Sequence, residues 1–120
     1  MTTPWPIRFE LAVDRVHDGD TIYGVIHADA GLDIWIESGR TGKGWGLRFY
    51  GINAPELNTD AGKLALAFLQ TLVKPGDTLT FDSYSFDKYQ KRIDGIPYTA
   101  AGMNLCQAML DSGNAVPYTG

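Results

Sequence analysis

Hydrophobic and polar residues alternate along several short segments of the chain, with the period of two that predicts half-buried β-strands. The clearest segment covers 7–13, where every second residue is hydrophobic. A second segment at 21–26 follows the Asp18-Gly19 turn, so we expect these two strands to form a hairpin. Further strands are expected at 34–36, 46–52, 78–82 and 93–99. Between them we expect an exposed loop at 38–44 and a polar turn at 83–91, and Pro97 predicts an edge strand.

The period changes to that of an amphipathic helix from Asp60 onward, and residues 74–76 end this helix. Its predicted apolar face consists of Leu64, Ala65, Phe68, Leu69 and Leu72. Asn104 followed by Gln107 resembles a capping box that opens a second helix, which Gly113 closes. The residues that this helix is expected to bury are Leu105, Cys106, Met109 and Leu110. The elements predict one small α+β barrel-like domain over residues 1–120.

Composition and charge narrow the function classes. The 120 residues include 10 Lys and Arg against 14 Asp and Glu, a net charge of −4. This charge argues against a protein that simply coats nucleic acid, but it does not exclude an enzyme whose cation reverses the field locally. No apolar run reaches the roughly 20 residues of a membrane helix, so no membrane partner is expected. The single cysteine fits a reducing compartment, and we expect a cytoplasmic monomer.

The stretch 47–56 carries the strongest chemical signal. It reads as a strand that ends in a turn stiffened by Pro55, and it brings Arg48, Asn53 and Glu56 close together. An Arg on a half-buried strand is unusual unless it meets an anion or faces solvent. Read alone, Arg48 is a solvated side chain and Glu56 an ordinary loop acid. Together they suggest a hard metal ion beside a phosphate.

Asp18 and Asp20 lie on the turn between the first two strands. Asp-Gly is among the commonest hairpin turns, so Asp18 alone has a purely structural interpretation. Asp20 is a second carboxylate that a turn does not require, and neighbouring carboxylates repel unless a cation lies between them. Ca²⁺ accepts carboxylate, amide and carbonyl oxygens, and Asp20, Asn53 and the carbonyl of Ala54 supply one of each.

The order of these motifs resembles that of the staphylococcal nuclease-like (thermonuclease) family over essentially the whole chain. The matching stretches are 16–21, 47–56, 87–89 and 102–115. The resemblance implies a five-stranded OB-fold barrel with two to three packed helices. It also implies cleavage of DNA, RNA or both with Ca²⁺, or with Mg²⁺ or another divalent cation, by breaking P–O5′ bonds and leaving 3′-phosphates. Phage and mobile-element members of the family have a similar sequence at the positions of residues 50–56, which implies a phage or mobile-element origin for this chain.

The resemblance assigns the metal ligands by position. Asp20 matches the metal-binding aspartate of the turn, Asp18 matches its acidic neighbour, and Ala54 matches the residue that offers a backbone carbonyl. Asn53 stands where well-known members have a metal-binding Asp. An amide oxygen still coordinates a cation but carries less charge, so Ca²⁺ affinity is expected to be lower.

The catalytic and substrate-binding residues follow in the same way. Arg48 matches the first catalytic arginine, and Glu56 matches the general base. Lys88 and Tyr89 match a pair that contacts a substrate phosphate.

The second catalytic arginine is a departure from the family pattern. Lys91 occupies its strict position, and Arg92 lies one residue further on. Arg92 serves if the strand is bulged, whereas Lys91 would supply a point charge without the bidentate fork. We take Arg92 as catalytic, and place Lys91 and Tyr118 with the substrate-binding residues. The alternative to an enzyme is a catalytically weak or inactive OB-fold module that binds nucleic acid or protein.

Overall fold

The computed structural model describes residues 7–29, 33–37, 46–87 and 92–118. In chain order the elements are β1 (Ile7–Asp18), β2 (Thr21–Asp29), β3 (Asp33–Glu37), β4 (Gly46–Phe49), β5 (Ile52–Asn53), α1 (Asp60–Leu72), β6 (Thr78–Asp87), β7 (Arg92–Tyr98), α2 (Leu105–Asp111) and β8 (Val116–Pro117).

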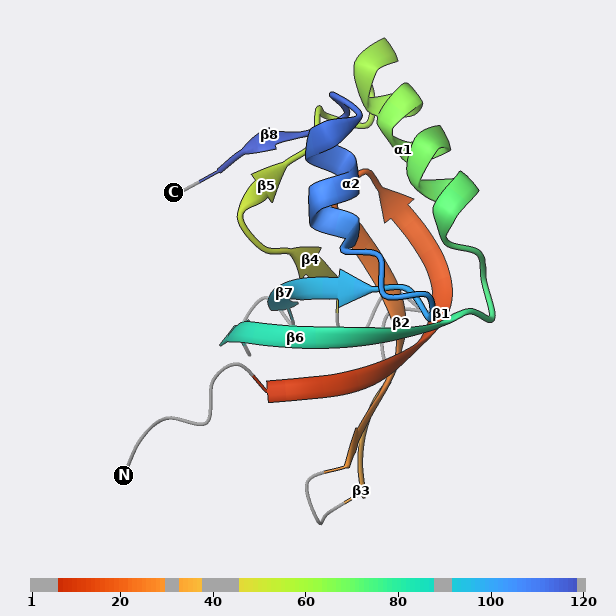
Figure 1. The fold of residues 1–120 in the computed structure, drawn as a ribbon, viewed down its shortest axis with the longest axis vertical. Helices are drawn as coiled ribbons and strands as arrows, with labels where there is room; N and C mark the ends of the chain where they lie inside the picture. The colour runs from red at the N-terminus through yellow and green to blue at the C-terminus, as the bar shows by residue number, and fades with distance from the viewer. Residues whose placement is uncertain (1–6, 30–32, 38–45, 88–91, 119–120) are drawn as a thin grey trace.

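Five of the strands close into a β-barrel (Figure 1). Hydrogen bonds join them in the order β1-β6-β7-β4-β2, and β2 pairs back onto β1. Neighbouring barrel strands are antiparallel except β4 and β7, which run parallel. β3 pairs with the later part of β2, Val25 to Asp29, beyond the residues that pair with β4. β5 pairs with β8 in a separate small sheet. This architecture confirms the predicted α+β fold with a five-stranded, OB-fold-like barrel and two helices.

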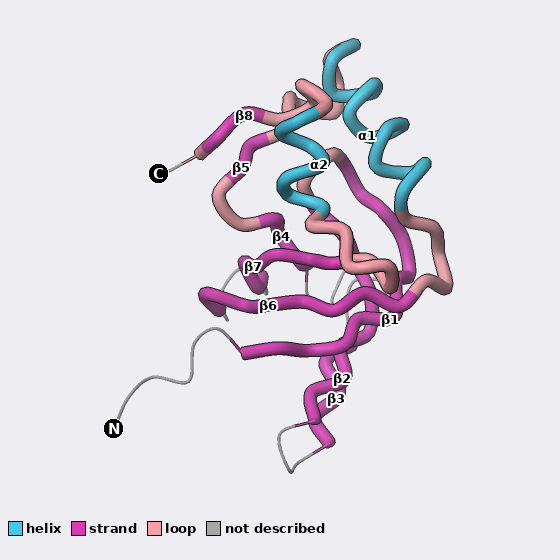
Figure 2. The backbone as a smooth tube through the Cα atoms, viewed as in Figure 1, coloured by secondary structure: helices cyan, strands magenta, loops and turns pink. Residues whose placement is uncertain are grey.

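Both helices lie at one end of the barrel, and the β2–β3 hairpin extends away from them (Figure 2). The predicted hairpin of the first two strands is confirmed, with Asp18 opposite Thr21 across the turn. The predicted strand at 34–36 is confirmed as β3. The expected loop at 38–44 lies outside the described residues.

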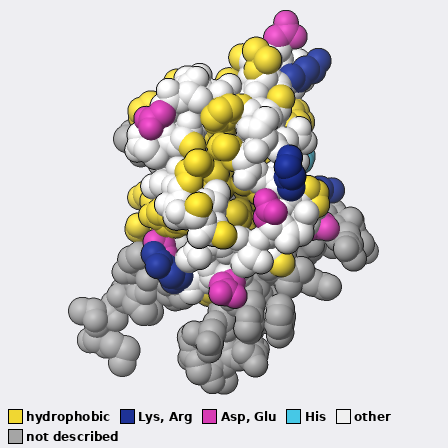
Figure 3. All heavy atoms as spheres, turned by 45° about the vertical axis from the view of Figure 1, so that its right-hand side comes forward, with side chains coloured by type: hydrophobic (Ala, Val, Ile, Leu, Met, Phe, Trp, Pro, Cys, Tyr) yellow, Lys and Arg dark blue, Asp and Glu magenta, His cyan; other side chains and the backbone are white. Residues whose placement is uncertain are grey.

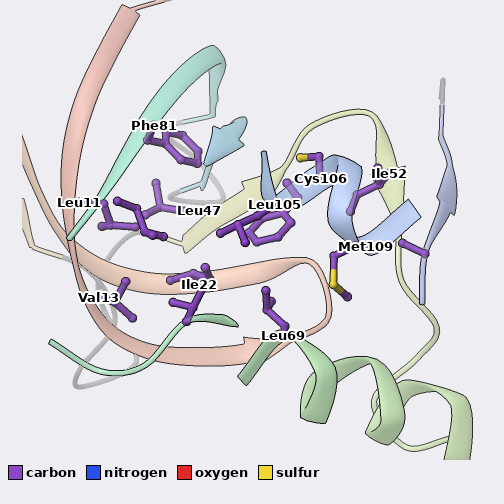
Figure 4. Close-up of a cluster of buried hydrophobic side chains, with 14 of the residues drawn as sticks. Leu11, Val13, Ile22, Leu47, Ile52, Leu69, Phe81, Leu105, Cys106 and Met109 are labelled. Atoms are coloured by element: carbon purple, nitrogen blue, oxygen red, sulfur yellow. The ribbon is translucent and has the colours of Figure 1, made fainter. Parts of the chain in front are cut away.

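The barrel interior is filled by hydrophobic side chains that face inward from every barrel strand, at alternating positions along each strand (Figure 4). The largest fully buried side chains are Leu11, Ile22, Leu47, Phe49, Ile52, Leu69, Leu79, Phe81, Ile93, Leu105 and Met109. Leu69 comes from α1, and Leu105 and Met109 come from α2, so the helices cover the barrel end that the strands leave open. Burial of such a side chain typically contributes about 1.5–3 kcal/mol.

The structure corrects the predicted apolar face of α1. Ala65 and Leu69 are buried as expected, and Phe68 and Leu72 are partly buried against the core, but Leu64 is 67% exposed. Gly62 is buried as well, and a Cβ atom there would lie 1.8 Å from the carbonyl oxygen of Glu56 in the connection that precedes the helix. Its contact face is therefore rotated away from Leu64 and toward Gly62.

The predicted single strand at 46–52 is also wrong. β4 ends at Phe49, and the chain turns through Tyr50 and Gly51 before β5 begins. Gly51 has a φ of 78°, a left-handed conformation that glycine adopts without strain. The turn redirects Ile52 and Asn53 so that they pair with β8 rather than continuing the barrel.

The polar turn predicted at 83–91 is wrong for its first part, because β6 continues to Asp87. Ser83 is buried in the barrel wall, whereas Asp82 meets Arg8 of β1 through a bidentate ion pair of 2.7 and 3.0 Å. Residues 83–87 alternate between polar and aromatic side chains, which was a signal for a strand that the predicted turn missed. Residues 88–91 lie outside the described part of the chain.

Pro97 lies just beyond the part of β7 that pairs with strands on both sides. The parallel pairing with β4 extends only from Arg92 to Gly95, and Pro97 pairs with β6 alone. The edge predicted from Pro97 is thus limited to the last residues of the strand. In the second helix, Asn104 caps the N-terminus by accepting a hydrogen bond from the backbone N–H of Gln107, and Leu105, Cys106 and Met109 are buried as expected.

No helix in the described part of the chain has the length and apolar character needed to cross a membrane.

Candidate active site

A buried carboxylate lies at the centre of the candidate site. Asp20, on the β1–β2 turn, is only 6% exposed. Its Oδ2 atom accepts a hydrogen bond from the backbone N–H of Ala54 at 2.9 Å and lies 2.7 Å from Nη1 of Arg48. The hydroxyl of Thr21 donates to its Oδ1 atom at 3.2 Å. The turn, β4 and the segment after β5 therefore converge on one side chain.

These contacts keep Asp20 ionised. Burial acts to raise its pKa, but the hydrogen bonds from Ala54 and Asp18 and the charge of Arg48 outweigh burial and lower the pKa below 3.8. Asp18 behaves in the opposite way, because burial and the neighbouring carboxylate of Asp20 raise its pKa. Asp18 also accepts a hydrogen bond from the backbone N–H of Asp20 at 3.1 Å, which orders the turn.

Arg48 connects the carboxylate to the segment that follows β4. Its Nη2 atom donates to the Oδ1 atom of Asn53 at 3.1 Å and lies 3.4 Å from the carbonyl oxygen of Ile52. Its guanidinium carbon lies 6.0 Å from the centre of the Tyr118 ring. The register of β2 and β4 causes this convergence, because Thr21 pairs with Arg48 and brings the strand alongside the turn.

The short β5–β8 sheet brings the last of these residues into place. Asn53 pairs with Val116, and the backbone N–H of Tyr118 donates to the carbonyl of Gly51 at 2.8 Å. The left-handed turn at Gly51 is thus the local reason that Asn53 and Tyr118 reach Arg48. The sequence prediction included both residues but not the turn that positions them, although the Tyr-Gly pair was a visible signal for it.

Glu56 lies in the connection between β5 and α1, and its side chain is exposed. Its carbonyl accepts hydrogen bonds from the N–H and the hydroxyl of Thr59, the N-cap of α1, at 3.0 and 2.6 Å. Because consecutive Cα atoms are about 3.8 Å apart, the Cα atom of Glu56 lies within about 7.6 Å of that of Ala54. The backbone of Glu56 is therefore fixed near the cluster, while its carboxylate faces solvent.

The remaining predicted residues belong to the region around the β6–β7 connection. Lys88, Tyr89 and Lys91 lie outside the described residues. Arg92 begins β7, where its backbone pairs with Gly46, two positions along β4 from Arg48. Its assignment as the second catalytic arginine, in place of Lys91, stays a prediction.

The donor set matches a hard divalent cation in chemical type. Asp20 supplies an ionised carboxylate and Asn53 an amide oxygen, and Ca²⁺ accepts both. Nevertheless, the described part of the chain contains no cluster of three His, Cys, Asp or Glu side chains suited to a metal. The guanidinium of Arg48 also contacts both oxygens already. A cation would therefore share these ligands with Arg48 or displace it.

A scan against protein-family models finds no family that matches the chain, and a search of curated proteins finds no significant match. The resemblance to the staphylococcal nuclease-like family accordingly depends on the motifs of the chain itself.

Proposed function

We propose that this protein is a metal-dependent nuclease that hydrolyses phosphodiester bonds of DNA, RNA or both. The observation that supports this proposal is the convergence of Asp20, Arg48, Asn53 and Ala54 from separate segments of the chain. A buried carboxylate, an amide oxygen and a guanidinium are the groups that a cation and a phosphate require. In this proposal Asp20, Asn53 and the carbonyl of Ala54 bind Ca²⁺, or Mg²⁺ or another divalent cation, and Asp18 supports the turn.

The protein side chains divide the work of hydrolysis. A cation bound by these oxygens would polarise a phosphoryl oxygen and neutralise its charge. Arg48 donates paired hydrogen bonds to the phosphoryl oxygens as negative charge increases on them. Glu56 accepts a proton from the attacking water as its oxygen forms the new P–O bond. The P–O5′ bond breaks, and the leaving oxygen takes a proton from solvent. Such general-base catalysis typically gives about 10²–10⁴ in rate.

The distribution of charged side chains favours recognition of a phosphate by a few local groups over binding to a broad positively charged surface. On the face drawn in Figure 3, Lys and Arg side chains lie singly among Asp and Glu. The net charge is −4. Binding of the substrate would therefore depend on the cation, Arg48 and residues near the β6–β7 connection, among which Arg92, Lys88, Tyr89 and Lys91 stay predictions.

The test is cleavage of plasmid, heat-denatured DNA and RNA with Ca²⁺, Mg²⁺ or EDTA. We expect cleavage that requires the cation and that falls about 10²–10⁴-fold in Glu56→Gln. Glu10→Gln, which alters an exposed carboxylate on β1, is the matched control and should cleave like the wild type. All variants are purified identically, and equal cleavage by Glu56→Gln and the wild type would reject Glu56 as the base.

One observation favours the alternative, a nucleic-acid or protein binding module without catalysis. Arg48 lies 2.7 Å from Asp20, so the carboxylate is already neutralised without a cation. In the same assay, DNA that is retarded on a gel but remains intact with every cation would support the binding module and contradict the nuclease.

A further inference from the structure

Two exposed tyrosines stack on each other on the outer surface of the barrel. The ring centres of Tyr50 and Tyr84 are 4.8 Å apart, and the ring planes differ by 21°. Tyr50 remains 48% exposed and Tyr84 36% exposed. Each ring therefore covers one face of the other and leaves much of its own surface open to solvent.

The fold brings these rings together from distant positions in the chain. Tyr50 follows β4, and its backbone N–H donates to the carbonyl of Gly95 in β7 at 2.7 Å. Tyr84 lies in β6 at a bulge, because the pairing of β6 with β7 shifts register between Ser83 and Ser85. A bulge redirects the side chain of the extra residue, which here is the tyrosine.

A third tyrosine of the barrel wall contacts a guanidinium. The guanidinium carbon of Arg8, in β1, lies 5.9 Å from the centre of the Tyr98 ring, in β7. The pKa of Tyr98 is raised first by burial and then by Asp82 and Tyr84.

This surface adjoins the candidate active site. Tyr50 lies two residues beyond Arg48 in the chain, a separation of about 7 Å for extended backbone. Tyr118 lies on another side of Arg48, with its ring centre 6.0 Å from the guanidinium carbon. Arg48 is therefore close to Tyr118 in space and to Tyr50 along the chain, and both tyrosines are exposed.

We propose that Tyr50 and Tyr84 form a platform on which an unpaired base of single-stranded DNA or RNA stacks. Cross-strand aromatic pairs also stabilise sheets, and a comparison of base-bearing with abasic strands separates that role from base binding. Bases stack on aromatic rings without sequence preference, and an added base would extend the existing stack by one layer. Bases within a duplex are already stacked and paired, so the platform selects single strands. The placement of a phosphate at Arg48 depends on the proposed function, whereas the stacking does not.

The test compares ligands that differ in one feature at a time: the bases, the sugar or the pairing of the strand. Fluorescence anisotropy in EDTA, which prevents metal-dependent cleavage, measures binding of labelled strands of about 12 nucleotides, within the site size of one OB fold. The ligands are a deoxyribose strand, a ribose strand, the corresponding duplex and an abasic strand with the same phosphates. We expect the wild type to bind both base-bearing strands about 5–150-fold more tightly than the abasic strand.

Variants assign that difference to the platform. Tyr84→Ala should remove most of the preference for bases and leave binding of the abasic strand unchanged, whereas Tyr84→Phe should retain the preference. Leu64→Ala, which removes an exposed hydrophobic side chain from α1, is the matched control and should bind like the wild type. Thermal unfolding of each variant confirms that it folds, and Tyr50→Phe and Tyr50→Ala repeat the comparison at the second ring.

Two results would overturn the platform: equal binding of the abasic and base-bearing strands by the wild type, or an unchanged preference in Tyr84→Ala. A ribose strand bound more tightly than the deoxyribose strand would assign the platform to RNA, and the reverse would assign it to DNA. Cleavage is scored separately. Stacking without cleavage would reject the nuclease alone, and cleavage without a preference for bases would reject the platform alone.

Discussion

The guanidinium of Arg48 contacts the carboxylate of Asp20, the amide of Asn53 and the carbonyl of Ile52 at the same time. Removing one partner of a buried ion pair typically costs about 3–5 kcal/mol, because the other charge remains without compensation. Loss of activity in an Arg48 variant would therefore combine a chemical effect with a loss of stability. The exposed side chain of Glu56 does not have this complication, which makes it the cleaner test of catalysis.

At this scale the sequence predicted that Asp20, Arg48 and Asn53 would lie close together, but not which contacts they would make. Asp20, Asn53 and Ala54 were expected to hold a cation, because each carries a suitable oxygen in a short motif. The direct contact of Arg48 with Asp20 depends on the pairing of Thr21 with Arg48 across two strands. That register is a property of the assembled sheet, so no local pattern reveals it. The stacking of Tyr50 on Tyr84 was missed for the same reason, since it depends on a bulge.

Asp18 makes stability depend on pH in a predictable direction. Its pKa is raised above 3.8, so the folded state binds this proton more tightly than the unfolded state. That contribution is present below pH 3.8 and is lost as pH rises through the folded pKa. Asn at this position keeps an oxygen for the N–H of Asp20 but does not titrate. We expect the free energy of unfolding of Asp18→Asn, relative to wild type, to increase from acidic to neutral pH.

Urea unfolding over a pH series in EDTA measures this difference. Asp20 acts in the opposite direction, because its lowered pKa gives stability that is present above pH 3.8 and lost as pH falls through its folded pKa. Asp20 is present in both proteins, but its pKa also depends on the hydrogen bond from Asp18, so the comparison measures the titration of the two carboxylates together. A difference that stays constant or shrinks with increasing pH would contradict the assignment.

At the scale of elements, α1 is the helix whose contacts differ most from its hydrophobic pattern. From spacing alone, Leu64 and Leu69 are both expected to be buried on the apolar face. In the structure Leu69 is completely buried, whereas Leu64 is 67% exposed. The buried residues of the helix are Gly62, Ala65 and Leu69, and Phe68 and Leu72 pack beside them. A periodicity argument gives little weight to glycine and alanine, so it extended the apolar face to Leu64.

The two leucines therefore make a direct test of the orientation of α1. Leu69→Ala should lower the free energy of unfolding by about 2–5 kcal/mol, because it leaves a cavity in the core. Leu64→Ala should change it by no more than about 0.5 kcal/mol. Urea denaturation of both variants measures the contrast. Similar losses in the two variants would show that α1 packs through the face predicted from the sequence.

Replacing Gly62 by Ala is expected to change stability in the direction opposite to the usual one. Ala in place of Gly inside a helix ordinarily stabilises by about 1 kcal/mol. Here a Cβ atom would lie 1.8 Å from the carbonyl oxygen of Glu56, so the helix or the connection must shift. We expect Gly62→Ala to destabilise by about 1–3 kcal/mol, as overpacking does. It should also reduce any cleavage, because Glu56 would move.

The neighbouring substitution Lys63→Ala is the control for helix propensity and should change stability by no more than about 0.5 kcal/mol. Thermal unfolding and the plasmid assay are run on the same preparations. Stabilisation by Gly62→Ala would mean that the connection before α1 accommodates a methyl group and does not fix Glu56.

At the scale of the whole molecule, the barrel is closed by pairings between distant parts of the chain. β1 pairs with both β2 and β6, and β4 runs parallel to β7. Alternating residues identify the inward face of each strand, which is why most strands could be located from the sequence. The same alternation does not say which strand lies beside which. The barrel itself was therefore expected from the motif resemblance, and the pairings come from the structure.

Cys106 offers a measurement of how the whole molecule opens. Its thiol is 5% exposed, and burial raises its pKa to about 12. Because the thiolate is the reactive form, a disulfide reagent at mildly alkaline pH should label the folded protein far more slowly than the denatured protein. Since the sequence has only one cysteine, the labelling rate reports the exposure of Cys106, whether α2 opens locally or the whole molecule unfolds.

If labelling requires global unfolding, Leu69→Ala should accelerate it by the factor that corresponds to its loss of stability, tenfold for every 1.4 kcal/mol. Labelling of the folded wild type as fast as of the denatured chain would contradict the burial of Cys106. An unchanged rate in Leu69→Ala would indicate that α2 opens locally, without the barrel.

Gly19 sits where the turn, the segment after β5 and α1 touch. A methyl group there would come within 2.8 Å of the Cβ atom of Ala54 and 2.9 Å of that of Ala65. The turn that carries Asp20 is therefore packed against both the segment after β5 and α1. A displacement of the turn toward either one would press on it, so we expect the backbone around Asp20 and the start of α1 to move together.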